Sequence, residues 1–206
     1  AINIGKNFDT PIARAADDYL HCFEKVYPYA DYITVNISSP NTKDLRDLQG
    51  GAELDKLLGS LVRRRADLAD DHDRCVPLAV KVAPDLDDEQ IAVIAEVVAR
   101  HRLDAVIATN TTISRAGVEG MKFADEAGGL SGAPLKPMAD RVLVALRKAL
   151  PGEVALIGVG GITCGQDAVD KLDRGAALVQ FYTGMVYRGP ELVNECLQAI
   201  ADRNRE

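Results

Sequence analysis

The sequence predicts an α/β fold, specifically a (β/α)8 TIM barrel to which this chain of 206 residues contributes about six C-terminal β-α units. Predicted strands and helices alternate six times, and nearly every strand is a continuous apolar run, as in a parallel sheet that is covered on both faces. Polar or glycine-rich segments follow the strands at their C-terminal ends, where such barrels keep their active sites. The last two of these segments are rich in glycine, which is typical of phosphate binding at this position.

The spacing of apolar residues defines the predicted elements. Residues 10–27 and 52–69 place apolar side chains at helical spacing, and Pro11 suits a first helical turn. Asp87 and Gln90, three residues apart, have the pattern of a capping box at the start of a third helix. This third helix is expected over residues 87–100, and further helices over 137–150, shortly after residue 161, and over 190–200. The strands are expected over residues 1–6, 32–36, 78–84, 105–108, 154–159 and 178–181.

A complete barrel has eight strands and about 250 residues, so the sequence predicts that two β-α units are absent. If they belong on the N-terminal side, the strands seen here are the third to the eighth, and the glycine-rich segments follow the seventh and eighth. The runner-up fold is an open doubly wound sheet, but the sequence has no G-x-G-x-x-G after a first strand, and functional residues follow five successive strands. We expect a single domain over residues 1–206 that is incomplete at its N-terminus.

The composition is globular and disfavours several functional classes. Hydrophobic residues make up 47% of the chain, and the formal net charge of −7 opposes a nucleic-acid-binding surface. The four cysteines are far apart and do not cluster with the three histidines, which predicts neither a metal site nor a disulfide framework and fits a reducing compartment. No apolar run approaches the ~18 to 20 residues of a membrane span, and the start lacks a signal-peptide pattern, so this chain by itself is expected to be soluble.

Two polar segments each begin directly after a predicted apolar strand. In residues 36–42, Asn36 and Asn41 offer amides and Ser39 a hydroxyl, so this segment could bind a planar polar ligand on several edges, although an ordinary Ser/Asn/Pro turn is the alternative. Residues 109–112 are a second segment of the Asn/Thr kind. An irregular stretch of ~24 residues then exceeds the usual βα loop, and we expect it to be a functional lid or wall.

Lys81 interrupts a strand that is otherwise apolar. An inward charge is costly without a partner, so an anionic ligand is expected nearby, unless the side chain extends from the strand to solvent. No Asp/Glu pair, histidine triad or metal cluster accompanies it, which disfavours glycosidase, serine-hydrolase and metal-hydrolase chemistry. The pattern suits a phosphorylated cofactor that brings its own reactivity.

Six motifs follow one another along the chain: NISSPNT at residues 36–42, KVAPDL at 81–86, ATNTT at 108–112, GGLSG at 128–132, GVGGI at 158–162 and YTG at 182–184. Together they resemble those of dihydroorotate dehydrogenases of the quinone-dependent class, and the resemblance extends from Asn3 to the last helix. The soluble class usually carries cysteine where this chain has Ser39, so the serine indicates the quinone-linked class.

The resemblance implies an FMN-binding barrel enzyme that oxidises dihydroorotate to orotate in de novo pyrimidine biosynthesis and passes electrons to quinone. Ser39 would be the base that removes a proton from C5 while a hydride passes from C6 to N5 of FMN, and Thr42 could relay the proton. By the family's pattern, the substrate would be bound by Asn36, Asn41, Asn110 and Thr111, and the FMN by Asn3, Asn36, Lys81, Thr109, Gly132, Gly160, Gly161, Tyr182 and Thr183.

The family's N-terminal helices, which form its quinone channel, and its first β-α units have no counterpart here. The full-length enzyme would be peripheral on the cytoplasmic face of the inner membrane through that absent region. Three alternatives stay open: a phosphate- or FMN-binding barrel fragment without turnover, the soluble-class dihydroorotate dehydrogenase, or another FMN barrel reductase. A dihydrouridine synthase would need a basic RNA-binding face, which the charge of −7 opposes.

Overall fold

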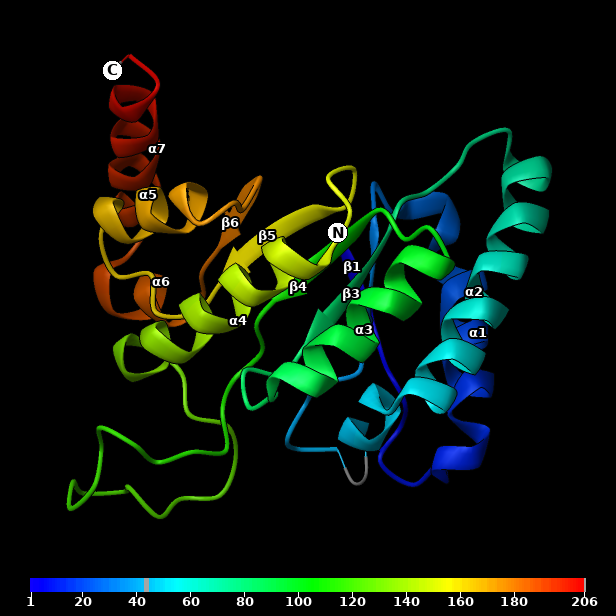
Figure 1. The fold of residues 1–206 in the computed structure, drawn as a ribbon, viewed down its shortest axis with the longest axis horizontal. Helices are drawn as coiled ribbons and strands as arrows, with labels where there is room; N and C mark the ends of the chain where they lie inside the picture. The colour runs from blue at the N-terminus through cyan, green and yellow to red at the C-terminus, as the bar shows by residue number, and fades with distance from the viewer. Residues whose placement is uncertain (43–44, 206) are drawn as a thin grey trace.

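Six parallel strands form one curled sheet in the computed structural model, which describes residues 1–42 and 45–205 (Figure 1). The strands lie in sequence order, so each pairs with the next strand along the chain. A doubly wound sheet would instead reverse its strand order at a central crevice. The predicted α/β fold is therefore confirmed and the runner-up is wrong. The strands are β1 (Ile2–Ile4), β2 (Ile33–Asn36), β3 (Leu78–Val82), β4 (Ala105–Ala108), β5 (Ala155–Val159) and β6 (Leu178–Gln180).

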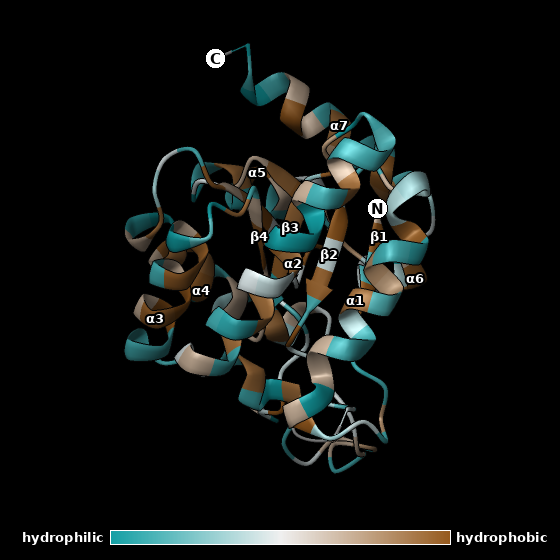
Figure 2. Cartoon of the chain, turned by 90° about the vertical axis from the view of Figure 1, so that its right-hand side faces the viewer, coloured by the Kyte–Doolittle hydropathy of each residue, from teal (hydrophilic) through white to brown (hydrophobic). Residues whose placement is uncertain are grey.

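The helices cover the outer side of the sheet, and successive helices from α1 to α4 pack against one another (Figure 1). Figure 2 shows strands that are mostly hydrophobic and helices that carry both kinds of residue, as amphipathic helices at a surface do. The helices are α1 (Ala15–Val26), α2 (Gly51–His72), α3 (Asp88–Arg100), α4 (Lys136–Ala149), α5 (Gly165–Asp173), α6 (Thr183–Arg188) and α7 (Glu191–Arg203).

Helix starts follow the sequence signals with two differences. The capping box is confirmed, because the Asp87 side chain accepts a bond from the N–H of Gln90 at 2.8 Å and the Gln90 side chain accepts one from the N–H of Asp87 at 3.0 Å. Helix α1 begins later than predicted, since Pro11 keeps an extended backbone with ψ of 148° and a 3-10 turn precedes the helix. Helix α6 was not predicted, because six residues are too few to show a helical repeat.

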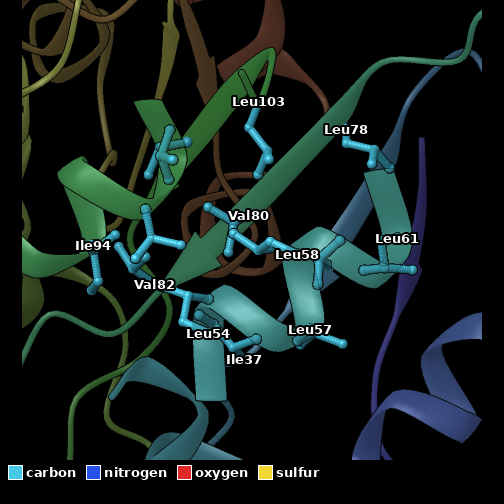
Figure 3. Close-up of a cluster of buried hydrophobic side chains, with 14 of the residues drawn as sticks. Ile37, Leu54, Leu57, Leu58, Leu61, Leu78, Val80, Val82, Ile94 and Leu103 are labelled. Atoms are coloured by element: carbon cyan, nitrogen blue, oxygen red, sulfur yellow. The ribbon is translucent and has the colours of Figure 1, made fainter. Parts of the chain in front are cut away.

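The main core lies between the sheet and the helices (Figure 3). Val80 and Val82 of β3 point into it and meet side chains such as Leu58 of α2 and Ile94 of α3, all fully buried. Each such side chain contributes about 1.5 to 3 kcal/mol on burial. Since side chains alternate along a strand, this packing directs Lys81 to the opposite, concave face of the sheet.

The concave face has a smaller core of its own. Ala79, Ile107 and Ile157 are buried there. The side-chain amide of Gln180 on β6 donates to the hydroxyl of Tyr32, just before β2, at 2.9 Å. This bond links β6 to the residue that precedes β2, across strands that are not neighbours in the sheet, so it stabilises the curl.

The predicted long irregular stretch is present as a loop over residues 113–132 without regular helix or strand (Figure 1). Arg115 fixes its shape by donating to the carbonyl oxygens of Glu126 at 2.7 Å and Gly128 at 2.9 Å. Thr112 and Leu130 pair as an isolated antiparallel bridge at its base. Among the helices of the described residues, none has the length and apolar character needed to cross a membrane.

Candidate active site

A cavity of about 400 Å³ lies at the C-terminal ends of β3 to β6. Many residues that the sequence predicted for the cofactor or the substrate line it together. Asn3 does not: it is exposed on β1 and lies outside this lining. The predicted residues that line the cavity are Lys81, Thr109, Asn110, Thr111, Gly132, Gly160, Gly161, Tyr182 and Thr183.

The polar segments after β2 and β4 are joined by their side chains. The Asn110 amide donates to Asn36 Oδ1 at 3.2 Å and to Ser38 Oγ at 3.1 Å, and the Ser38 N–H donates to Asn36 Oδ1 at 3.2 Å. The hydroxyl of the fully buried Tyr19 donates to the backbone carbonyl of Asn36 at 2.6 Å. Burial raises the pKa of Tyr19, so the hydroxyl stays protonated and remains a donor. Asn36 and Asn110 are thereby held in fixed orientations.

Ser39 and Asn41 lie beside this junction, outside the lining of the cavity. Ser39 is half-buried, and its Oγ accepts a bond from the N–H of the exposed Asn41 at 3.3 Å. The 113–132 loop passes close by: a Cβ added at Gly129 would lie 1.8 Å from Thr111 Oγ1 and 2.9 Å from Pro40 Cγ. Only glycine fits at this contact, so the loop lies directly against both polar segments; its role as a functional lid or wall stays a prediction.

The glycine-rich segment after β5 approaches α4 closely. Gly161 has a φ of 76°, and a Cβ there would lie 2.3 Å from Lys136 Cβ. Backbone N–H groups in such turns can bind an anion. Ser131, which sequence reasoning missed, shares a hydrogen bond of 2.8 Å with Thr183 and joins the 113–132 loop to the segment after β6.

Lys81 reaches this cavity as a half-buried amine. Burial lowers the pKa of Lys81, and within the described part of the chain no charged group offsets that cost. An anionic ligand in the cavity would supply the missing partner.

Behind the glycine-rich segment, α4 and α5 share a cluster of charges that sequence reasoning also missed. Lys171 is fully buried, with its Nζ 2.6 Å from Asp140 Oδ1, although not in hydrogen-bonding geometry. Burial lowers the pKa of Lys171 despite this neighbour. Lys136 donates to Asp170 at 2.7 Å. Asp167 accepts bonds from the N–H and the hydroxyl of Thr163 at 2.8 and 2.9 Å, beside the glycines.

Fold and site together define a barrel-type α/β protein with amides, hydroxyls and one lysine around a cavity, an arrangement suited to a phosphorylated cofactor. No group of three metal-ligating side chains occurs in residues 1–42 and 45–205. A family model described as dihydroorotate dehydrogenase matches residues 1–203. The chain belongs to the dihydroorotate dehydrogenase family, which is flavin-dependent in general.

Curated relatives carry the name dihydroorotate dehydrogenase (quinone). The chain is 61% identical to the one from Paraburkholderia phymatum over 202 residues, covering 98% of this chain and 59% of the relative. It is also 61% identical to the one from Ralstonia nicotianae over 200 residues, covering 97% and 58%. The chain therefore spans a little over half the length of these relatives.

Solved structures agree with the barrel prediction. The dihydroorotate dehydrogenase of Eimeria tenella in complex with ferulenol superposes with a TM-score of 0.90 at 37% identity, over 96% of this chain and 56% of that one. Its ligand-free form gives a TM-score of 0.88, also at 37% identity, over 95% and 57%. The six strands seen here thus form part of a TIM barrel.

Proposed function

We propose that this chain carries the active site of a quinone-dependent dihydroorotate dehydrogenase, which oxidises dihydroorotate to orotate in de novo pyrimidine biosynthesis. The observation that carries the proposal is the junction of Asn36 and Asn110, whose side chains meet at 3.2 Å beside the cavity that Lys81 enters. The names of the relatives support the same reaction.

We propose FMN as the flavin. The site fits it in two respects: Lys81 is a half-buried amine whose charge needs an anionic partner, and Gly160 and Gly161, both with positive φ, line the cavity in a turn of the kind whose N–H groups bind phosphate. The FMN site would be completed by Thr109, Gly132, Tyr182 and Thr183. Asn3 does not line the cavity, so its predicted role in binding FMN has no support there. Bound FMN would supply the hydride acceptor.

The chain's own groups would bind the substrate and move its proton. Asn36, Asn41, Asn110 and Thr111 would hold dihydroorotate through amide and hydroxyl bonds. Ser39, held by the N–H of Asn41, would accept the proton from C5. The wall formed by the 113–132 loop would keep bulk water from these groups. Relay of the proton by Thr42 stays a prediction.

Quinone is the electron acceptor we propose, because the curated relatives carry it in their names. Peripheral association of the full-length enzyme with the inner membrane stays a prediction from the family resemblance.

The test uses a protein of the relatives' full length that carries this sequence. Its visible spectrum should show bound flavin, dihydroorotate should bleach that flavin without oxygen, and a short-chain quinone should restore the colour. A colourless protein would favour the fragment without turnover. Flavin that dihydroorotate fails to bleach would favour another FMN barrel reductase, and recovery with soluble acceptors but not with quinone would favour the soluble class.

Replacing Lys81 with alanine is expected to lower the midpoint potential of the bound flavin. Lys81 would stabilise negative charge on the reduced cofactor, and losing a charge-assisted contact of about 1.5 to 3 kcal/mol corresponds to roughly 30 to 60 mV for a two-electron couple. The potential can be measured by dye-linked reduction, with the exposed Lys148→Ala on α4 as the control. An unchanged potential in Lys81→Ala with flavin still bound would leave Lys81 a structural role only.

A further inference from the structure

Arg46 contacts the ends of three strands at once. It lies in a short 3-10 segment (Leu45–Gln49) after the Ser39 segment. Its Nη1 donates to Asp85 Oδ2 at 2.8 Å, its Nη2 to the Thr111 carbonyl at 3.0 Å, and its Nε to the Ser38 carbonyl at 3.3 Å. These partners follow β3, β4 and β2, respectively.

Asp85 extends the same network. Its carboxylate accepts hydrogen bonds from the Thr112 hydroxyl and from the N–H of Ile113 at 3.4 Å, where the 113–132 loop begins. The Arg46 and Asp85 side chains are only 20% and 18% exposed. Because arginine stays protonated and such a charge is costly when it is poorly solvated, each of the two side chains needs the other.

The two carbonyls that Arg46 holds are next to the groups of the proposed reaction. Ser38 precedes Ser39, the proposed base, and Thr111 follows Asn110, a proposed substrate ligand. The guanidinium is planar and its N–H groups point in fixed directions, so it sets the separation of its acceptors more rigidly than a lysine ammonium could.

We propose that Arg46, oriented by Asp85, is a positioning residue that sets the distance between the Ser39 hydroxyl and the substrate held by Asn110 and Thr111. This inference rests on the proposed oxidation of dihydroorotate. Arg46 itself need not touch the substrate, because it acts through the Ser38 and Thr111 backbone. Its effect should therefore fall on proton removal from C5 more than on binding of the flavin.

The test compares Arg46→Gln, Arg46→Lys and Asp85→Asn in the full-length flavoprotein. We expect Arg46→Gln to lower the limiting rate of flavin reduction roughly 10²-fold, the size of effect that an ångström-scale misplacement produces. The isotope effect from deuterium at C5 should rise relative to that from deuterium at C6, while flavin content stays unchanged. Arg46→Lys and Asp85→Asn, which keep part of the network, should show smaller losses in the same direction.

Arg147 provides a matched control at the opposite end of the sheet. Its guanidinium also donates to backbone carbonyls, those of Leu150, Pro151 and Val154, where α4 leads into β5. Arg147→Gln should lower thermal stability and leave the rate and both isotope effects unchanged.

Two different results would contradict the inference. If Arg46→Gln reduces flavin at the unsubstituted rate, or loses rate with no change in the C5 isotope effect, Arg46 has a structural role only. If dihydroorotate fails to bleach even the unsubstituted protein, the proposed function is wrong, and the proposed role of Arg46 is then wrong as well. The unsubstituted protein thus separates the two failures.

Discussion

Replacing Ser39 with alanine is expected to slow flavin reduction by dihydroorotate roughly 10² to 10⁴-fold, the usual range for the loss of a general base. A serine hydroxyl is a weak base at neutral pH because its alkoxide is costly, so its surroundings must assist. In the structure the Asn41 N–H donates to Ser39 Oγ at 3.3 Å, which favours negative charge on that oxygen. Gly129 of the 113–132 loop lies against Pro40, the residue that follows Ser39.

Stopped-flow bleaching of the flavin measures this effect. Orotate affinity should change far less than the rate, because binding is assigned to the amides of Asn36, Asn41 and Asn110. Ser39→Cys should keep part of the rate with an altered pH dependence, since a thiol has a pKa of about 8.5. Ser60→Ala on α2 is the control and should have no effect, because that hydroxyl donates to the Lys56 carbonyl and accepts from Arg63 within the same helix. A nearly normal rate in Ser39→Ala would show that the proton goes to another group.

Replacing Asp140 with alanine is expected to destabilise the protein by about 3 to 5 kcal/mol, because it leaves a buried cation without its partner. Lys171 is fully buried, and the Asp140 side chain is 13% exposed. Lys171→Met should cost less, since it removes the buried charge and leaves Asp140 near Lys136 and Arg174, at 3.7 and 3.6 Å.

The pH dependence identifies the cause of this destabilisation. Burial already lowers the pKa of Lys171, and removing Asp140 lowers it further. The unfolded chain then binds a proton that the folded chain releases, so stability rises with pH. The deficit of Asp140→Ala relative to the unsubstituted protein should therefore shrink as the pH rises toward the folded-state pKa of Lys171, which burial holds below the ordinary lysine value of about 10.4. Urea unfolding of the full-length protein at several pH values measures this; a deficit below about 1 kcal/mol, or one independent of pH, would contradict the account.

Much of the fold was predictable because its signals are local. The apolar runs of the strands and the capping box of Asp87 and Gln90 depend on residues close in the sequence, and all six strands were expected in the right order. Helix α6 was missed because its six residues include Gly184 and lack an apolar stripe. Its place is set by tertiary packing, since α6 contacts α7 and Gly184 lies against Leu192 and the Ile162 carbonyl.

The site was predictable where a motif carried it and not where it depends on contacts between distant segments. The residues around the cavity came from the family motifs, and the structure brings most of them together. Arg46 gave no signal, because its role requires three strand ends to meet. Asp140 and Lys171 resemble ordinary surface charges in the sequence, and only the tertiary fold brings them together, where Lys171 packs against Gly158 of β5.

The order of the strands has a consequence for handling the isolated chain. Among the described strands, β1 and β6 each have a neighbour on one side only, so each presents unpaired N–H and C=O groups along its other edge. Exposed strand edges are templates for pairing with another chain. Leu178, on β6 itself, is also an exposed apolar side chain. Two copies of this chain could therefore extend each other's sheet, and aggregation would compete with refolding increasingly as the protein is concentrated.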